Sequence, residues 1–475
     1  MRPVALLAIL IAAGCGGSAA VLPGQQPASA RTPIAHIVIM VQEYRSFDNV
    51  FAGFPGADTT MQGPCKPSPS WCKTARSVPL HSVKLESSGT PNLGTDIDHS
   101  HHGFKLECDP TAGNVCRNDG FDLIRFGESG EGTPAELYPY AYIDRAESKP
   151  YWDLAGRYAL ADHMFSTDTA SSFIAHQQIL SGTVRYSDDA SLTDQPNNVP
   201  WGCDAPGPQS GSGQITWTPL LYSDGRYDFE GPFPCFTQYG TIADLLDAAN
   251  VSYLYYVDAM FENQPHYDFS GAVWNGFDAI RKFRYSADWK KRISIPNTGI
   301  FSDIQNGTLP SVSWVIPTLL DSDHPASGCN GGPWWVTKVV NALGTSAYWR
   351  NTAIVLFWDD WGGWYDNVPP PQINYTSLGF RVPLLVISPY AKPHYVSSTQ
   401  YDIGSILKFV EQTFGLGSLG TTDATANSLA DMLDFTQKPT AFKAAALPPV
   451  ETCGKQQTAP GQARRIIDHD GGIPE

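Results

Sequence analysis

Residues 354–371 read IVLFWDDWGGWYDNVPPP, an apolar run that stops abruptly at two adjacent carboxylates, Asp359 and Asp360. An uninterrupted apolar run is typical of a buried strand in a parallel sheet, and ligands of such sheets bind just outside the carboxyl ends of the strands. Neighbouring carboxylates repel each other unless a cation or a proton neutralises them, so this position predicts a metal site. The alternative is an acidic pair in a solvated loop. Gly362 and Gly363 allow the chain to turn tightly after the pair.

The composition limits both the fold and the partners. With 475 residues, of which 42% are apolar, the chain can bury a large core in one large α/β domain or in two to three smaller ones. The formal net charge of −16 argues against a nucleic-acid partner and against electrostatic adhesion to anionic membranes. An anionic substrate stays open, because a bound metal can reverse the local field.

The first 31 residues have the pattern of an export signal. A positively charged start is followed by a short apolar run at residues 4–13 and by small residues before Cys15. This order predicts a signal peptide over residues 1–15, and its Ala-Ala-Gly-Cys ending resembles a bacterial lipobox with Cys15 as the lipid anchor. Plain secretion is the alternative, and the protein is expected to be exported in either case. Residues 16–31, rich in Ser, Ala, Pro and Gln, are expected to form a flexible tether.

Eight cysteines remain once Cys15 is set aside, and an even number in an exported protein indicates disulfides. None of their spacings is a CxxC metal motif. Closure of short loops favours the first two pairs, and elimination leaves the other two: Cys65–Cys72, Cys108–Cys116, Cys203–Cys235 and Cys329–Cys453.

Alternating strand and helix patterns predict an α/β fold with a mainly parallel sheet. We expect a single domain over residues 32–453, with a surface insertion at 184–235 and a polar tail at 454–475. The expected strands, besides the opening one, cover residues 36–42, 251–257, 312–316 and 384–388. The expected helices cover residues 241–249 and 334–343, together with a third that begins near Ile403 and ends at Gly415.

Chemically useful side chains follow several of these elements. The strand at 36–42 ends at Glu43, again a carboxylate at the end of a buried strand, and a serine-rich turn leads through Ser172 into a helix. The first N–H groups of that helix would form an anion site. Carboxylates for a metal, a hydroxyl nucleophile and loop histidines such as His99 and His324 are the groups that phosphoryl transfer needs.

Three segments resemble the bacterial phosphoesterase family of phospholipase C and acid phosphatase type. Residues 43–48, EYRSFD, match its signature ENRSFD, and Ser172-Phe173 with His176 resembles its nucleophile segment SFPNH. Residues 359–371 resemble its segment DExGGFYDHVPPP. Shorter matches in the family's order are DIDHS at 96–100, DGF at 119–121, DHP at 323–325 and GFRVP at 379–383. The resemblance implies an alkaline-phosphatase-like fold, in which helices flank the sheet and loop-rich insertions surround it, and hydrolysis of phosphate esters.

The resemblance also implies roles for individual residues. Ser172 would be the nucleophile that forms a phosphoseryl intermediate, and His324 would protonate the leaving alcohol. His99 matches a second active-site histidine, while His266 is a candidate on its position alone. The expected metal-binding positions are Glu43, Tyr44, Asp359 and Asp360.

Two departures from the family pattern affect the predicted metal site. Tyr44 stands where the family has an asparagine ligand, and Asp360 is one methylene shorter than the usual glutamate. Oxygen ligands suit Mg, Ca or Mn, while an added histidine would admit Zn or Fe, so the metal stays unassigned.

The residues after Phe173 are atypical of the phospholipase branch, which favours an acid-phosphatase-like phosphomonoesterase. No exposed amphipathic stretch is evident that would indicate action at a lipid surface. The alternatives are a phospholipase C that cleaves phospholipid headgroups and a catalytically degenerate binding lipoprotein.

Overall fold

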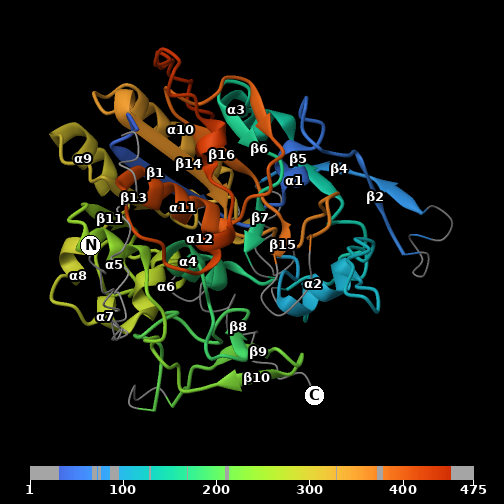
Figure 1. Cartoon of the computed structure of the whole chain (residues 1–475). Coiled ribbons are helices and arrows are strands. Elements are labelled where there is room, and N and C mark those ends of the chain that lie inside the picture. Colours follow the sequence, from blue (N-terminus) through green and yellow to red (C-terminus); the bar gives the residue numbers. More distant parts are fainter. Residues whose placement is uncertain are drawn as a thin grey trace, which may run out of the picture. The chain divides into compact units, whose positions relative to one another are not determined.

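The computed structural model describes residues 32–66, 72, 76–85, 96–127, 130–167, 169–208, 213–327, 329–371 and 378–450. The predicted signal peptide, lipobox, tether and polar tail lie outside these residues. The core of residues 32–450 is an eight-stranded sheet with helices on both sides (Figure 1).

The central sheet is mainly parallel, as the sequence predicts. All neighbours from β12 to β14 are parallel, whereas β16 is antiparallel to both β14 and β6. The antiparallel strand makes the sheet a mixed one. In spatial order the strands are β12 (Ile293–Ser294), β11 (Tyr253–Tyr256), β13 (Val312–Val315), β1 (His36–Gln42), β14 (Thr352–Trp358), β16 (Leu384–Ile387), β6 (Ala159–Ala161) and β17 (Tyr395–Ser397).

The register between β1 and β14 brings the candidate carboxylates together. The two parallel strands pair from His36 with Thr352 to Gln42 with Trp358, so both end at the same level. The backbone N–H of Asp359 then donates to the carbonyl of Gln42 at 2.9 Å. Residues that follow the two strands therefore emerge side by side at one edge of the sheet.

The helices form two groups, and within each group the helices contact one another. Strands β1 and β14 lie between the two groups (Figure 1). The expected helices at 241–249, 334–343 and from Ile403 are present, and Gly415 caps the last one in a left-handed conformation. One group is α3 (Arg145–Ala155), α9 (Gly299–Asn306) and α10 (Gly331–Gly344); the other is α4 (Ser172–Ser181), α5 (Ile242–Ala248) and α11 (Ile403–Phe414).

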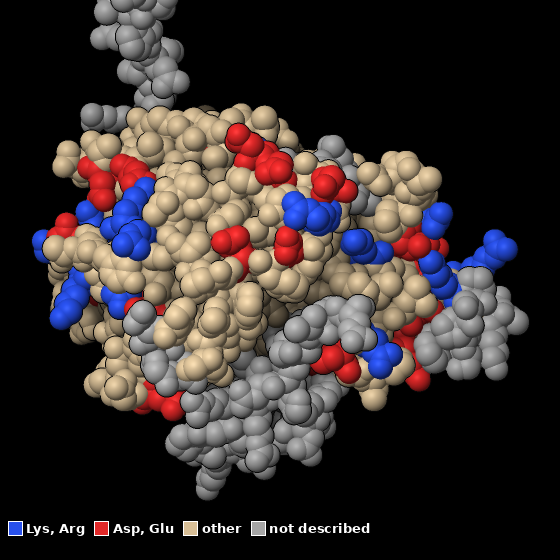
Figure 2. Space-filling view, turned by 90° about the horizontal axis from the view of Figure 1, so that it is seen from below, with Lys and Arg blue, Asp and Glu red and all other residues tan. Residues whose placement is uncertain are grey.

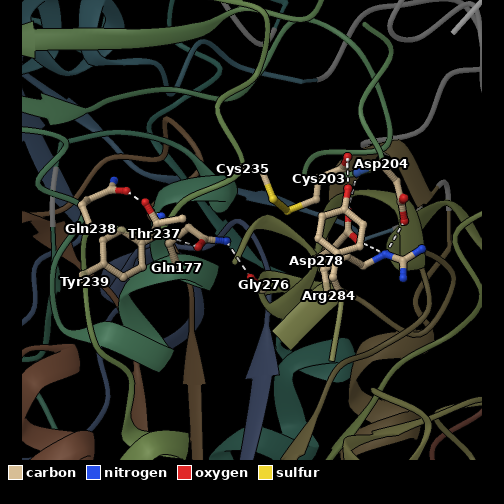
Figure 3. Close-up of a disulfide and its surroundings, with 11 residues drawn as sticks. Gln177, Cys203, Asp204, Cys235, Thr237, Gln238, Tyr239, Gly276, Asp278 and Arg284 are labelled. Atoms are coloured by element: carbon tan, nitrogen blue, oxygen red, sulfur yellow. Dashed lines mark hydrogen bonds and ion pairs between the residues drawn. A yellow bond between two sulfur atoms is a disulfide. The ribbon is translucent and has the colours of Figure 1, made fainter. Parts of the chain in front are cut away.

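The expected surface insertion contains a three-stranded antiparallel sheet of β8 (Ala190–Leu192), β9 (Thr218–Tyr222) and β10 (Tyr227–Glu230). The disulfide Cys203–Cys235 joins the chain before β9 to the chain after β10 (Figure 3). Beside it, Arg284 Nε lies 2.5 Å from Asp204 Oδ2 and 3.0 Å from Asp278 Oδ1. A disulfide therefore closes the segment that contains β9 and β10, and ion pairs through Arg284 join Asp204, near the start of that segment, to Asp278.

The pairs Cys65–Cys72, Cys108–Cys116 and Cys203–Cys235 are confirmed as disulfides. Cys329 is also disulfide-bonded, and Cys453 lies outside the described residues.

In the described part of the chain, no helix has the length and apolar character needed to cross a membrane. The remaining elements are α1 (Phe47–Phe51), β2 (Gln62–Pro64), β3 (Ser77–Pro79), β4 (His81–Val83), α2 (His101–Cys108), β5 (Ala141–Ile143), β7 (Phe165–Thr167), α6 (Phe269–Val273), η2 (Gly276–Ala279), α7 (Arg281–Arg284), α8 (Trp289–Arg292), η3 (Pro325–Ser327), η4 (Trp349–Asn351), β15 (Leu378–Arg381), α12 (Thr422–Thr425) and η5 (Leu429–Met432).

Candidate active site

Three carboxylates and one hydroxyl meet beyond the ends of β1 and β14. Ser172 Oγ lies 3.2 Å from both Glu43 Oε2 and Asp360 Oδ2, and all of these side chains are buried. A hydroxyl carries one hydrogen and can donate it to only one carboxylate at a time. Burial and the neighbouring Asp359 raise the pKa of Glu43 and of Asp360 well above their usual range. The cluster therefore requires a cation or protons to offset its negative charge.

His176 adds a nitrogen to this cluster. Its Nε2 lies 3.0 Å from Glu43 Oε1, and ligand atoms of Glu43, His176 and Asp359 all lie within 4.8 Å of one another. Burial lowers the pKa of His176 to about 4, so the ring is neutral, which is the form that binds metals. Asp359 Oδ2 is buried and has no hydrogen-bond partner among the described residues. The donor set fits a divalent metal with mixed nitrogen and oxygen ligands.

The phenol of Tyr44 is directed to other partners. Its hydroxyl hydrogen-bonds to Asp96 and, at 2.9 Å, to the carbonyl of Ile97, while its backbone N–H donates to Asp359 Oδ1 at 3.0 Å. The backbone of Tyr44 is left-handed, with a φ of 70°. Gly362 packs against it so closely that a Cβ there would lie 2.3 Å from the Tyr44 carbonyl oxygen. Tyr44 thus reaches the cluster through its backbone, and its hydroxyl is engaged elsewhere.

His99 lies on the side of the cluster where Asp96 holds the Tyr44 hydroxyl. Its Nδ1 is 2.8 Å from the carbonyl of Ile97, and its ring centroid is 4.6 Å from that of Tyr44. Its Nε2 is buried without a hydrogen-bond partner in the described structure. Burial opposes the charged ring, but Asp360 and Asp96 outweigh it and raise the pKa of His99.

The loop that carries His324 is held by the ends of both central strands. Asp323 donates its backbone N–H to Gln42 Oε1 at 3.0 Å and accepts from Trp358 Nε1 at 2.9 Å. The half-buried ring of His324 lies 4.6 Å from the ring of Tyr44. Burial lowers the pKa of His324 to about 4. The two central strands therefore position this histidine as well as the carboxylates.

His266 has a different environment. It is exposed, with a left-handed φ of 61°, and its carbonyl accepts the N–H of Ala259 at 2.9 Å. No hydrogen bond or ring contact joins it to the buried cluster in the described residues. The structure brings together the other candidate residues but not this one.

Helix α4 presents Ser172 and His176 on the same face. The residue after His176, Gln177, forms hydrogen bonds to residues outside the helix. Gln177 donates from Nε2 to the carbonyl of Gly276 at 3.0 Å and accepts from the Tyr239 hydroxyl at 2.9 Å (Figure 3). Residues four apart on a helix lie one turn above each other. The spacing of four residues between Ser172 and His176 was therefore the signal in the sequence that could have identified His176 as a partner of Ser172.

Several relatives of this chain are named as phospholipases C. The haemolytic phospholipase C of Pseudomonas aeruginosa is 24% identical over 85% of this chain and 56% of its own length. Phospholipase C A of Mycobacterium tuberculosis is 25% identical over 86% of this chain and 78% of its own. The non-haemolytic phospholipase C of Burkholderia pseudomallei is 25% identical over 85% and 60%. The chain thus spans little more than half of the Pseudomonas enzyme.

Solved structures show weaker similarity. An alkaline phosphatase superfamily protein from Vibrio parahaemolyticus is 13% identical, with a TM-score of 0.32, over 60% of this chain and 65% of its own. The phosphonate monoester hydrolase of Silicibacter pomeroyi is 11% identical, with a TM-score of 0.31, over 62% and 73%. Sequence carries the assignment instead, since residues 34–417 match the phosphoesterase family. The chain belongs to the phosphoesterase family.

Proposed function

We propose that this chain hydrolyses phosphate esters with Ser172 as the nucleophile. The observation that carries the proposal is the position of Ser172 Oγ, 3.2 Å from two buried carboxylates at the first turn of α4. The first N–H groups of a helix lack partners within the helix and are suited to phosphoryl oxygens; in α4 the N–H of Ile174 already donates to the Ser171 carbonyl at 3.1 Å, which leaves the earlier ones for an anion. A nucleophile, an anion site and a dry carboxylate cluster are thereby combined at one point.

The proposed cofactor is a divalent metal held by Glu43, Asp359, Asp360 and His176. When bound, such a metal lowers the pKa of a serine hydroxyl and stabilises negative charge on a phosphoryl group. Tyr44 replaces the family asparagine, and its hydroxyl is engaged with Asp96 and Ile97 instead of the metal site. We propose that the nitrogen of His176 takes the place of that lost ligand. Nitrogen in the ligand set favours Zn or Fe over Mg, Ca or Mn.

The reaction then needs one proton donor and one water molecule. Ser172 Oγ attacks phosphorus, the bond from phosphorus to the alcohol oxygen breaks, and a histidine gives the departing oxygen its proton. Water next cleaves the phosphoseryl bond and restores the hydroxyl. We assign the proton donor to His99, because Asp360 and Asp96 outweigh burial and raise its pKa, whereas burial lowers the pKa of His324 to about 4 and makes that ring the alternative. Loss of the donor should slow esters of alcohols more than esters of nitrophenol, which leaves without a proton.

We further propose a phosphodiester of the phospholipid headgroup type as substrate. The relatives reported above are named as phospholipases C, which supports a phosphodiester substrate. They give no support to the acid-phosphatase-like monoesterase expected from sequence. The disulfides support export, since such bonds persist in oxidising compartments. Lipid attachment at Cys15 stays a prediction, which the mass of the mature protein with and without Cys15→Ala would check.

The test is hydrolysis of p-nitrophenyl phosphate and p-nitrophenyl phosphorylcholine, with chelator and after addition of Mn, Zn, Ca or Mg. Ser172→Ala should lower turnover at least about 1000-fold. Ser171→Ala is the matched control, because that neighbouring hydroxyl is bonded to Gln195 and outside the cluster. Preference for the monoester would restore the phosphatase assignment. No turnover by a cooperatively melting protein would contradict hydrolysis and favour a binding role.

A further inference from the structure

The β8–β10 insertion exposes an unusual concentration of large apolar side chains. Among the described residues, eleven large hydrophobic side chains are exposed, and four of them lie between positions 215 and 229. They include three of the five exposed aromatic rings. We call this set the aromatic patch: Ile215 at 38% exposure, Trp217 at 44%, Tyr227 at 42% and Phe229 at 45%. Exposed apolar groups this close together indicate an interaction surface.

The strand ladder gathers the rings of the patch on one face. Tyr227 pairs with Leu221 and Phe229 with Pro219, and paired residues share a face of the sheet. The rings of Tyr227 and Phe229 touch edge to face with centroids 5.3 Å apart. Continuing the same ladder places Trp217 opposite Gly231, where a Cβ would lie 3.1 Å from the indole. The patch is a built surface and not a set of scattered side chains.

We propose that the aromatic patch docks the protein on a zwitterionic phospholipid bilayer. Tryptophan and tyrosine favour the interface between headgroups and acyl chains, where an apolar ring can be buried beside polar groups. This inference rests on the proposed phospholipase C type of function, since such an enzyme must meet its substrate in a membrane.

Charge decides which lipid the patch fits. Residues 185–230 contain seven acidic side chains, two arginines and no lysine. One of the arginines, Arg226, is paired with Asp228 at 2.9 Å. Figure 2, which views the side of β8–β10, shows mostly uncharged surface between scattered acidic and basic groups. A mostly uncharged, ring-bearing surface whose charged residues are predominantly acidic disfavours anionic lipids and attracts the outermost quaternary ammonium of choline lipids.

The patch is joined to the candidate active site through hydrogen bonds. The Tyr227 hydroxyl donates to Asp194 Oδ2 at 3.0 Å, and Asp194 Oδ1 accepts the backbone N–H of His101 at 2.6 Å. The ring of His101 lies 2.7 Å from Thr169 Oγ1, three residues before Ser172. Docking through the patch would therefore bring the bilayer to the loops that frame the nucleophile.

The experiment measures binding without hydrolysis. The full chain carrying Ser172→Ala is sedimented with vesicles of phosphatidylcholine alone or mixed with phosphatidylglycerol. The double variant Trp217→Ser/Phe229→Ser, made on that background, should bind phosphatidylcholine vesicles at least tenfold more weakly. Phe435→Ser, which removes a ring exposed to 37% elsewhere, is the matched control and should bind as before. Melting curves check that each variant is folded.

A second readout separates this inference from the proposed function. With Ser172 intact, Trp217→Ser/Phe229→Ser should hydrolyse soluble p-nitrophenyl phosphorylcholine at the parent rate and vesicle phosphatidylcholine at least tenfold more slowly. Equal vesicle binding by parent and double variant would overturn the docking surface, as would binding that requires anionic lipid or no binding at all. Failure of the soluble assay alone would instead overturn the proposed hydrolysis, because the sedimentation result does not depend on turnover.

Discussion

The strand-end cluster of Glu43, Ser172 and Asp360 and the aromatic patch on β9–β10 are built in opposite ways. In the sequence, Ser172 is 129 residues from Glu43 and 188 residues from Asp360, yet the three side chains meet and all are buried. The patch comes from one continuous insertion, and its side chains are exposed. Reacting groups need fixed geometry in a dry site, whereas a docking surface needs area that water can leave. The two regions should therefore respond differently to the same kind of change.

The largest difference should follow removal of one carboxylate charge. Asp360→Asn keeps an oxygen for the Gly362 N–H, which now donates at 2.7 Å, but removes a proposed metal ligand and the repulsion with Asp359. We expect at least about a 100-fold loss of kcat/KM if Asp360 is the ligand that we propose. In chelator the same variant should melt at a higher temperature than the parent.

The corresponding change in the insertion is Asp228→Asn, which removes an exposed carboxylate paired with Arg226. Exposed ion pairs contribute about 0–1 kcal/mol, so neither turnover nor melting should change appreciably. A lower melting temperature for Asp360→Asn in chelator would show that the cluster is not under electrostatic strain.

A second difference should appear at two left-handed glycines. Gly362, with a φ of 61°, has the Tyr44 carbonyl 2.3 Å from the position of a Cβ, while Gly225, with a φ of 85°, has nothing within 4 Å. Alanine at either position should cost about 1–2 kcal/mol for the backbone. Gly362→Ala adds a clash between two fixed loops and should total about 3 kcal/mol or more. Denaturant unfolding of both variants measures the difference in the free energy of unfolding. Equal losses of stability would mean that the loop at Gly362 shifts to accommodate the added methyl group.

How far the sequence predicts these regions depends on whether the interaction is local. The apolar runs of β1 and β14 and their terminal carboxylates are visible in the chain, so Glu43 and Asp359 could be placed in advance. The antiparallel direction of β16 could not, because it depends on strand order, which only long-range pairing fixes. The direction of the Tyr44 phenol likewise follows from a left-handed backbone that no local pattern indicates.

The patch escaped prediction for a different reason. The insertion is rich in Pro, Gly, Asp and Ser, a composition typical of loops, so the alternation that places Tyr227 and Phe229 on one face was not recognised. No exposed amphipathic stretch is evident in the sequence, whereas in the structure the alternating side chains of Tyr227 and Phe229 are exposed. Exposure is a property of the fold, because a similar alternation in a core strand would be buried.

A buried carboxylate outside both regions supplies a third, smaller test. Burial and the nearby Asp423 raise the pKa of Glu411 on α11 to about 7, and its carboxylate accepts the Leu419 N–H at 3.1 Å. A carboxyl whose folded pKa is raised contributes stability that is present below its unfolded pKa of 4.5 and lost as pH rises through about 7.

Glu411→Gln keeps the acceptor for Leu419 and cannot ionise. Its stability relative to the parent should be unchanged near pH 4.5 and should gain about 1–2 kcal/mol by pH 8, a range that allows for solvent screening. Denaturant unfolding across this pH range, with and without added metal, checks the result. A gain that depends on metal would show that Glu411 is coupled to the cluster, against the expectation from its position.

The smallest expected effect concerns the hydrogen bond between the patch and the active-site loops. Tyr227→Phe removes the donor to Asp194 Oδ2 and keeps the ring beside Phe229. Asp194 retains the His101 N–H, so the loss of stability should be about 1 kcal/mol. Vesicle binding on the Ser172→Ala background should stay within about twofold of the parent, because the apolar area is preserved. If Tyr227→Phe weakened binding as much as Trp217→Ser/Phe229→Ser, the hydrogen bond rather than the exposed rings would control docking. The patch and the cluster would then act as one unit.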